Sequence, residues 1–481
     1  MDKKRLNLRK VAMIVACLAV TTMFAACDNK NGDEDDGKGG GTPGTAVWAK
    51  NFGGSATESF SSVVAVSDGY VAVGYSFAAS FNNGDWDGIS GKGAQDGIIV
   101  KFDQNGGVVW KKNFGTSNDE QFTSVVSDGD GGCVAAGYKG MTDGDWAGTT
   151  NKSGQDAAIV RFDRDGKVVW KNNFGGSKGS MSEFHSVTRG PNGFIAVGWS
   201  GSLAFGGNDW AGVTGNGGQD GIIVCFDQTD GHIRWKNHFG GSGSEDFESV
   251  AYTTDGYVVA GYASENTFNT GDWTEISPKG DRDAIIMKFD LNGNKVWAKN
   301  FGGSGTEDFS SVVSTSSGIF AVGHSSKASF GSGDWTGLTA KGGTYDATIV
   351  KFDQNGNALW QKNFGGTGND YFYSVVPVAS DGVVAVGSAA GFNTGDWSGL
   401  TNKGNNDATI VKFDNNGNVL WKKNFGGNMG ELFLSVTADS NGYIAVGNAN
   451  QITFGSGDWT GLTGKGTEGG INDAIIVKFR E

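Results

Sequence analysis

Residues 421–479 read WKKNFGGNMGELFLSVTADSNGYIAVGNANQITFGSGDWTGLTGKGTEGGINDAIIVKF, and variations on this stretch make up the chain from residue 46 onward. Its opening tryptophan recurs at intervals of 60 to 65 residues, at Trp48, Trp110, Trp170, Trp235, Trp297, Trp360 and Trp421. A fixed period of this length indicates a repeat architecture rather than several unrelated domains. Seven copies of one structural unit are therefore expected.

Each copy contains four short apolar runs of strand length, rich in Val, Ile and aromatic residues. In the first copy these runs are Phe60–Val66, Tyr70–Tyr75, Ile98–Phe102 and Val108–Phe114. The last two are joined by Asp103-Gln104-Asn105-Gly106, in which Asp can bond the turn backbone and Asn-Gly accepts positive φ. This pattern predicts a hairpin turn. Binding of Ca²⁺ is the alternative role for these turns, although an EF-hand needs a longer series of ligands.

The two ends of the chain complement each other. The last copy ends after its third strand, Asp473–Phe479, whereas Val47–Phe52 is a fourth strand without a third strand before it. Pairing of these two segments would close a ring and remove the exposed edges that an open array would leave. The sequence therefore predicts an all-β, seven-bladed β-propeller of four-stranded antiparallel blades, closed by the N-terminal strand in the C-terminal blade.

Composition agrees with many strands and tight turns. The chain has 83 Gly and only 4 Pro, without a Gly-X-Y period, and 12% of its residues are aromatic. The first 26 residues carry five basic groups and one acidic group, so the remainder of the chain, whose total net charge is −14, carries −18. Such an acidic protein repels nucleic-acid phosphate and anionic lipid headgroups, which disfavours both as partners.

The N-terminus has the features of a secretion signal. A basic region that includes Lys3 and Arg9 precedes the apolar stretch 11–24, which is too short to span a bilayer comfortably. It ends in Phe24-Ala25-Ala26-Cys27, which resembles a bacterial lipobox and implies cleavage before Cys27 and diacylation of its thiol. An ordinary secretory signal is the alternative.

We therefore expect three regions: a lipoprotein signal peptide over 1–26, an acidic and Gly-rich flexible tether over 27–45, and the propeller over 46–481. The acidic run 33–36 in the tether resembles the surface-export signals of Bacteroidetes lipoproteins, with a solvated spacer as the alternative. The expected location is extracytoplasmic, with the N-terminal lipid as the only attachment to the membrane.

The long segments between the second and third strands of each copy are expected to gather on one face of the propeller. Each contains an Asp-Trp pair, and the seven tryptophans are Trp86, Trp146, Trp210, Trp273, Trp335, Trp397 and Trp459. One interpretation is a ring of indoles and carboxylates that stacks on sugars or holds cations. The other is structural: Asp caps the loop backbone and Trp covers the gap between blades. Recurrence in every copy favours the structural interpretation.

Residues that do not recur are better candidates for specificity. Trp199, His324, Tyr345, Tyr371 and Tyr373 stand out in this respect. Trp199, Tyr345 and Tyr371 join the seven loop tryptophans as candidate ligand-binding residues.

The sequence contains no recognisable catalytic or metal-binding motif. The four His occupy non-equivalent positions in the repeats, and the sequence has no HExxH zinc helix, no GxSxG elbow with a predicted helix to hold it and no P-loop. Cys133 and Cys225 lie at different positions of neighbouring copies, which indicates neither a disulfide framework nor a metal cluster. Glycoside hydrolysis needs only two carboxylates, and 52 acidic residues leave that possibility open.

The motif Trp-x-Lys-Asn-Phe-Gly-Gly, followed by Asp-Gly-Tyr-x-x-Ala-Gly-Tyr, resembles a family of bacterial secreted β-propeller lipoproteins over Trp48 to Phe479. Some relatives are labelled endoglucanase-like, which implies a connection with polysaccharides. The stretch Gly417-Asn418-Val419-Leu420-Trp421 also resembles the docking motif of quinoprotein-type propellers. Those enzymes usually have eight blades and a quinone cofactor, whereas this chain has seven copies and no adjacent Cys pair, so we expect no cofactor.

These observations favour a binding or scaffold protein over an enzyme. The expected partner is a glycan or a protein of the cell envelope, bound by a monomer through the face that carries the long loops. A polysaccharide-cleaving enzyme and a purely structural envelope protein are the alternatives.

Overall fold

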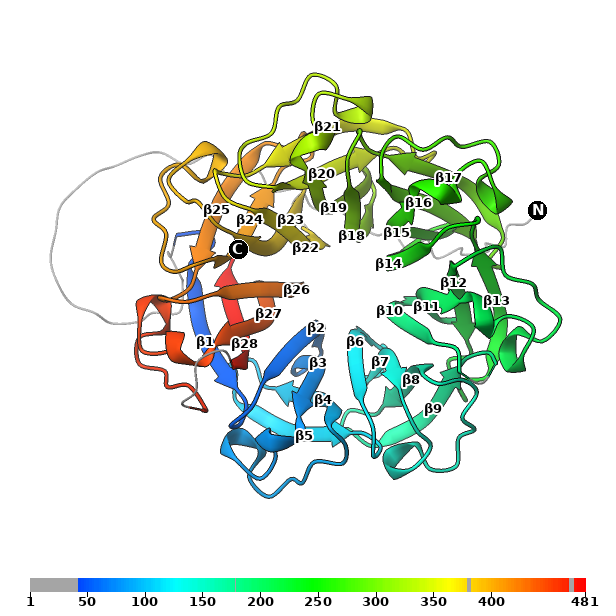
Figure 1. Cartoon of the computed structure of the whole chain (residues 1–481). Helices are drawn as coiled ribbons and strands as arrows, with labels where there is room; N and C mark the ends of the chain where they lie inside the picture. Colours follow the sequence, from blue (N-terminus) through cyan, green and yellow to red (C-terminus); the bar gives the residue numbers. More distant parts are fainter. Residues whose placement is uncertain (1–41, 178, 379–381, 467–470) are drawn as a thin grey trace, which may run out of the picture. The chain divides into compact units, whose positions relative to one another are not determined.

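The computed structural model describes residues 42–177, 179–378, 382–466 and 471–481, which form one compact unit from Thr42 to Glu481. Its strands form seven separate four-stranded sheets arranged as a ring of blades (Figure 1). Every pairing within a sheet is antiparallel. The predicted all-β, seven-bladed propeller is confirmed.

The chain runs outward from the centre through each blade in turn (Figure 1). Blade 1 consists of β2 (Glu58–Val66), β3 (Gly69–Phe77), β4 (Gln95–Phe102) and β5 (Val108–Phe114). Blade 2 consists of β6 (Glu120–Ser127), β7 (Cys133–Lys139), β8 (Asp156–Phe162) and β9 (Val168–Phe174). Blade 3 consists of β10 (Ser182–Gly190), β11 (Gly193–Gly201), β12 (Gln219–Phe226) and β13 (Ile233–Phe239).

The remaining blades repeat this order. Blade 4 consists of β14 (Glu245–Thr253), β15 (Gly256–Ser264), β16 (Arg282–Asp290) and β17 (Lys295–Phe301). Blade 5 consists of β18 (Glu307–Thr315), β19 (Gly318–Ser326), β20 (Tyr345–Phe352) and β21 (Ala358–Phe364). Blade 6 consists of β22 (Asp370–Pro377), β23 (Val383–Ala389), β24 (Asp407–Phe413) and β25 (Val419–Phe425). Blade 7 consists of β26 (Glu431–Asp439), β27 (Gly442–Asn450), β28 (Asn472–Arg480) and β1 (Ala46–Phe52).

The first and last strands, β1 and β28, pair in blade 7, as predicted. Strand β1 pairs with β28, with Phe52 opposite Ala474 and Lys50 opposite Ile476. The backbone contact continues beyond the strand, because Gly44 N–H donates to the carbonyl of Arg480 at 3.1 Å. The edge of β28 is therefore paired where the ring closes.

Aromatic rings fill the spaces between blades. The Trp of each outermost strand lies against a turn of the next blade; Trp48 Nε1, for example, donates to the carbonyl of Gln104 at 3.2 Å. Gly106 sits under this indole with φ of +78°, where a Cβ would approach the ring to 3.0 Å. At the seam no turn joins β28 to β1, and Gly44 takes the corresponding place under Trp421. The seam of the ring thus repeats the contact made between the other blades.

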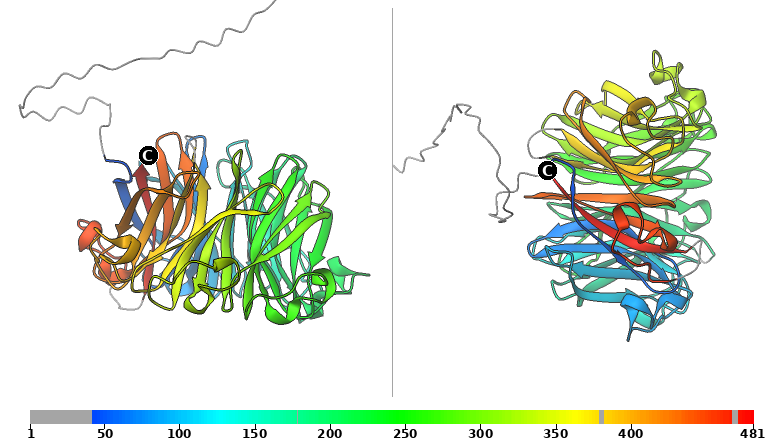
Figure 2. Two further views of the ribbon diagram at one scale, coloured as in Figure 1. Left: turned by 90° about the horizontal axis from the view of Figure 1, so that it is seen from above. Right: turned by 90° about the vertical axis from the view of Figure 1, so that its left-hand side faces the viewer.

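Short 3₁₀ helices make up much of the long loops between the second and third strands. They are η1 (Ala78–Ser80), η2 (Gly84–Trp86), η3 (Gly144–Trp146), η4 (Ser202–Ala204), η5 (Asn208–Trp210), η6 (Glu265–Thr267), η7 (Gly271–Trp273), η8 (Lys327–Ser329), η9 (Gly333–Trp335), η10 (Gly395–Trp397), η11 (Gln451–Thr453) and η12 (Gly457–Trp459). Figure 2 shows these loops gathered on the face of the propeller away from the C-terminus.

The Asp-Trp pairs in these loops are part of the framework. All seven of their indoles, Trp86, Trp146, Trp210, Trp273, Trp335, Trp397 and Trp459, are at most 1% exposed. The preceding Asp accepts a hydrogen bond from a glycine N–H in the link that enters the innermost strand of its own blade, as Asp85 does from Gly53 at 3.0 Å. A buried ring offers no face to a sugar, so the burial of these seven residues favours the structural interpretation, and their role in ligand binding stays a prediction.

The same aspartates also tie neighbouring blades together. Each is contacted by a residue of the preceding blade at 2.5–3.3 Å, in the pairs Lys92–Asp145, Lys152–Asp209, Asn216–Asp272, Lys279–Asp334, Lys341–Asp396, Lys403–Asp458 and Lys465–Asp85. The last pair bridges the seam. Partly exposed pairs of this kind contribute little energy each, but together they fix how each loop sits on its neighbour.

Candidate functional site

The innermost strand of each blade contains a β-bulge at the same position. In β10 Phe184 pairs with Gly198 and Ser186 pairs with Val197, so His185 has no partner across the sheet. In β14 the residue left over is Glu248. Bulges re-aim side chains and occur often beside functional sites. The seven residues in this position, here called the bulge residues, are Ser61, Thr123, His185, Glu248, Ser310, Tyr373 and Leu434.

Two invariant partners hold the bulge in place. The glycine opposite it allows the strands to approach closely: at Gly198 a Cβ would lie 2.0 Å from the carbonyl oxygen of Glu183. The serine after the bulge accepts a hydrogen bond from the next blade, as Ser186 Oγ does from Val250 N–H at 3.3 Å. This serine bond recurs at all seven interfaces, including Ser435 to Val63 at the seam.

All seven bulge residues line one cavity of about 410 Å³ at the axis, together with Gln121 and Asp308. The Phe before the bulge and the Ser after it are the same in every copy, whereas the bulge residue and the residue before the Phe vary, and no two blades carry the same pair. The residues that hold the bulge in place are therefore repeated in every blade, whereas the side chains that line the cavity are not. Cavities of several hundred Å³ with a few polar groups are typical of ligand sites.

The lining is asymmetric. Blades 3 to 5 contribute His185, Glu248 and Asp308, and blades 6 and 7 contribute Tyr373 and Leu434. Two residues before a bulge residue on the same strands lie Glu183, Asp246, Tyr371 and Leu432. One side of the cavity is thus acidic and the other is aromatic and apolar.

His185 is at the centre of the acidic side. Its Nδ1 lies 3.1 Å from Asp246 Oδ1 and 3.5 Å from Glu248 Oε2, and its Nε2 lies 3.3 Å from Glu183 Oε2. Burial opposes charge on the imidazole, but the nearby carboxylates of Asp246 and Glu248 prevail and raise the pKa of His185 well above its usual value. Burial raises the pKa of Asp246, whereas for Glu248 the attraction of His185 outweighs burial and lowers the pKa.

Arg282 and Asp308 form a second charged group beside the first. The guanidinium of Arg282 contacts both carboxylate oxygens of Asp308, with Nε–Oδ1 at 2.8 Å and Nη2–Oδ2 at 2.9 Å. It also stacks on Tyr262, with its carbon 3.2 Å from the ring centre. Burial raises the pKa of Asp308 to about 7 despite the arginine, and Glu248 and Asp246 add to the rise. His324 Nε2 lies 3.5 Å from Asp308 Oδ2, so four carboxyl groups in this part of the molecule are grouped with one arginine and two histidines.

The aromatic side brings together residues that the sequence marked as non-recurring. Ring centres lie 5.8 Å apart for Tyr345 and Tyr371, 5.1 Å for His324 and Tyr371, and 5.8 Å for the parallel rings of Tyr371 and Tyr373. Burial lowers the pKa of His324 to about 4, with Arg282 adding to the effect, so this imidazole is neutral near pH 7. Trp199 is half-buried on β11, opposite Glu183.

Several of the residues that make this site were missed by sequence reasoning. No sequence motif marks Glu183, Glu248 or Arg282, and Asp246 and Asp308 belong to β14 and β18. The signal that could have found them is the alternation along the innermost strand, where variable positions flank an invariant Phe.

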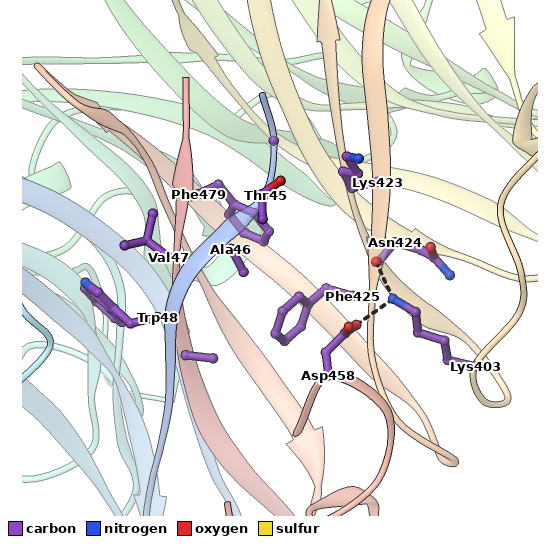
Figure 3. Close-up of a pocket in the computed structure, with 12 residues that line it drawn as sticks. Thr45, Ala46, Val47, Trp48, Lys403, Lys423, Asn424, Phe425, Asp458 and Phe479 are labelled. Atoms are coloured by element: carbon purple, nitrogen blue, oxygen red, sulfur yellow. Dashed lines mark hydrogen bonds and ion pairs between the residues drawn. The ribbon is translucent and has the colours of Figure 1, made fainter. Parts of the chain in front are cut away.

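A different hollow lies at the periphery, between blades 6 and 7. Figure 3 shows Lys403 at its wall, with Nζ bonded to the carbonyl of Asn424 at 2.8 Å and to Asp458, and with β1 on the other side. Similar hollows with an equivalent lysine occur between blades 1 and 2 and between blades 5 and 6. Because it recurs with the repeat, this hollow is a consequence of blade packing.

The remaining sequence predictions concern other parts of the chain. In the turn after β4, Asp103 Oδ1 accepts from the N–H groups of Asn105 and Gly107 at 2.8 Å each, so the carboxylate holds the turn itself. Cys133 and Cys225 are buried free thiols. Cys27 lies outside the described residues. The helices of the described segments are all too short to cross a membrane.

Comparison with known proteins gives partial matches. Residues 155–347 match the family model of the outer membrane protein assembly factor BamB. The regulatory protein FlaEY of Caulobacter vibrioides is 26% identical over 197 residues, which is 39% of this chain and 19% of FlaEY. The chain thus corresponds to about a fifth of the curated relative that it matches.

Solved propellers resemble the chain at low identity. Quinohemoprotein alcohol dehydrogenase ADHIIG of Pseudomonas putida has a TM-score of 0.44 at 10% identity, covering 91% of this chain and 76% of its own. Sqt1 of Chaetomium thermophilum has a TM-score of 0.46 at 10% identity, covering 91% and 100%. The WD40 domain of Doa1 has a TM-score of 0.40 at 12% identity, covering 91% and 98%.

Proposed function

We propose that this chain is a lipid-anchored, extracytoplasmic binding module whose axial cavity holds part of a glycan. The observation that carries the proposal is the division of the repeat into constant and variable positions. Constant residues build the ring, and the bulge residues, which vary between blades, line a single cavity. A purely structural ring would have no need for seven different arrangements of that lining.

The chemistry of the lining suits a sugar. Tyr345, Tyr371 and Tyr373 offer aromatic faces against which a pyranose ring can stack. Across the cavity, carboxylates such as Asp308 and Glu248 can accept hydrogen bonds from sugar hydroxyls. The match of residues 155–347 to an outer membrane assembly factor supports a binding or scaffold role in the cell envelope.

The test is binding of the full-length protein to an immobilised glycan array, followed by titration of the glycans that score. We expect Tyr371→Ala and Tyr373→Ala to weaken binding at least tenfold, because each removes a stacking face. Tyr252→Ala is the matched control. Tyr252 is 40% exposed and lies near the end of β14, whereas Tyr371 and Tyr373 lie on β22. Equal binding by the wild type and both cavity variants, with thermal melts showing that they fold, would exclude the cavity as the site.

Anchoring is tested separately. The basic and apolar residues before Cys27 support cleavage and lipidation at this residue. Cells that express the chain should incorporate labelled palmitate into it, and Cys27→Ala should abolish the label and release the protein from the membrane fraction. Retention of the label in Cys27→Ala would contradict the assignment.

A glycan-cleaving enzyme is a second candidate function. Asp308 and Glu248 both line the cavity, and their pKa values are displaced in opposite directions, to about 7 for Asp308 and downward for Glu248. A protonated and an ionised carboxyl group are what glycoside hydrolysis requires. Release of reducing sugar from a bound glycan, lost in both Asp308→Asn and Glu248→Gln, would favour this function over binding alone.

A further inference from the structure

Three side chains on neighbouring innermost strands direct potential metal ligands at a common point. They are His185 from β10 and Asp246 and Glu248 from β14. One atom of each, His185 Nδ1, Asp246 Oδ1 and a carboxylate oxygen of Glu248, lies within 4.8 Å of the other two. The distances from Nδ1 to the two carboxylates are 3.1 Å and 3.5 Å. Ligand atoms about 3.3 Å apart are expected around a tetrahedral ion with bonds near 2.0–2.1 Å.

The second nitrogen of His185 has the partner that metal-binding histidines usually have. Nε2 lies 3.3 Å from Glu183 Oε2, two residues away on the same strand. A carboxylate in this position holds the proton on Nε2 and orients the ring, so that Nδ1 can bind an ion in place of its own proton. Glu183 would therefore act as a positioning residue, one step removed from the ion.

The way Asp246 and His185 face each other is the second observation. Asp246 is 3% exposed, and its Oδ2 accepts a hydrogen bond from Tyr262 Oη at 3.3 Å. Its Oδ1 and His185 Nδ1 form a buried ion pair at 3.1 Å, in which neither atom has hydrogen-bond geometry. A cation between them would coordinate both atoms in place of the Nδ1 proton.

We propose that His185, Asp246 and Glu248 bind one divalent transition-metal ion of the Zn²⁺ class. The imidazole selects against Mg²⁺ and Ca²⁺, which prefer sites made of oxygen alone. His185 and Glu248 line the axial cavity, so an ion that they held would lie at its wall. Three protein ligands and one open position form a site at which the ion can contact a bound molecule directly.

A second trio of similar composition provides the control. Asp227, Asp230 and His232 gather at the turn between β12 and β13. Their carboxylates already hold the turn, since Asp227 Oδ1 accepts from Thr229 N–H at 2.8 Å and Asp230 Oδ1 from His232 N–H at 3.1 Å. The side chains of Asp230 and His232 are more than 60% exposed. This trio has the composition of the cavity site without its burial.

The experiment is calorimetric titration of Zn²⁺ into the full-length protein after removal of metals by a chelator. We expect one equivalent to bind with micromolar or tighter affinity. His185→Asn and Glu248→Gln should each weaken this binding at least a hundredfold, and Glu183→Gln should weaken it about ten- to a hundredfold because it acts through His185. His232→Asn should leave it unchanged.

Substitution of Co²⁺ gives a second readout that loss of folding would not imitate. Wild type and His232→Asn should show the visible absorption bands of Co²⁺ in a low-symmetry site, whereas Glu248→Gln, confirmed as folded by its thermal melt, should not. The proposal is overturned if Zn²⁺ binding survives in both His185→Asn and Glu248→Gln, or if it is lost in His232→Asn. These outcomes are independent of whether the cavity binds a glycan.

Discussion

At the residue scale, buried carboxyl groups recur at the interfaces between blades. Glu58 is fully buried where blade 7 meets blade 1, and it accepts from Gly54 N–H at 3.0 Å and from Ser76 Oγ at 2.8 Å. Burial raises its pKa to about 8 against the pull of these hydrogen bonds, and the neighbouring Asp473 adds to the rise. Glu245, Glu307 and Glu431 occupy the same position in other blades, with pKa values raised to about 8, 7 and 7.

These acids make the fold sensitive to alkaline pH. A carboxyl whose pKa is raised on folding contributes its stability below the unfolded pKa of about 4.5 and loses it as pH rises through about 8. Glu58→Gln keeps the shape and cannot ionise. We expect it to match the wild type at pH 4.5 and to exceed it by about 2–4 kcal/mol at pH 9, measured by urea unfolding at both pH values. If the difference in unfolding free energy between Glu58→Gln and the wild type is no larger at pH 9 than at pH 4.5, the raised pKa of Glu58 is contradicted.

The tryptophans of the loops between the second and third strands also act at the residue scale, through their burial. Trp335 is fully buried and packs edge-on against Phe301, with ring centres 5.0 Å apart. Trp335→Ala should cost about 3–5 kcal/mol in the free energy of unfolding because it opens a cavity between blades. Leu359→Ala is the control: Leu359 is 56% exposed, and its truncation should change stability by less than about 0.5 kcal/mol. A small effect at Trp335 would favour a ligand-binding role for the indoles.

At the scale of the element, the β-bulge of the innermost strand connects framework to site. It adds one residue to the strand and turns that residue toward the axis, so the same sheet carries His185 in one blade and Tyr373 in another. The glycine opposite permits it, because the carbonyl of the bulged strand occupies the place where a Cβ would be.

Substitution of that glycine should therefore disturb the site as well as the fold. Gly198→Ala would bring a Cβ to 2.0 Å from the Glu183 carbonyl, and we expect a loss of about 1–3 kcal/mol with weaker Zn²⁺ binding at the adjacent His185. Gly430→Ala is the matched control, because no atom lies within 4 Å of its added Cβ. Both quantities can be measured by denaturant unfolding and by the same titration. Equal effects of the two substitutions would argue against a role of the bulge.

At the scale of the whole molecule, the ring has no special starting point. The seam contains the same serine hydrogen bond, Lys–Asp pair and Gly–Trp contact as the other interfaces, through Ser435, Lys465 and Gly44. It differs in that blade 7 draws its outermost strand, β1, from the other end of the chain. Stability of the ring should therefore depend on the presence of β1 and not on its covalent connection.

Two rearranged chains test this expectation. Replacing residues 46–52 by a Gly-Ser segment of equal length should leave an open edge on β28 and lower the melting temperature by at least about 10 °C, with aggregation. A circular permutant, joined from residue 481 to residue 44 and opened between Asn292 and Gly293, should melt close to the wild type. Similar melting of the wild type and the Gly-Ser replacement would show that closure contributes little.

The sequence by itself determined the number of blades, the four strands in each and the closure at the termini, because these follow from a local period and from turn chemistry that each copy carries. It also identified Tyr345, Tyr371 and His324 as exceptions to the repeat. Tertiary structure decided what those exceptions do. Only the bulge directs His185, Glu248 and Tyr373 into one cavity, and only packing between blades buries the seven loop indoles. The physical reason is that a repeat fixes each blade through neighbouring residues, whereas a site on the axis depends on side chains about sixty residues apart that meet when the ring closes.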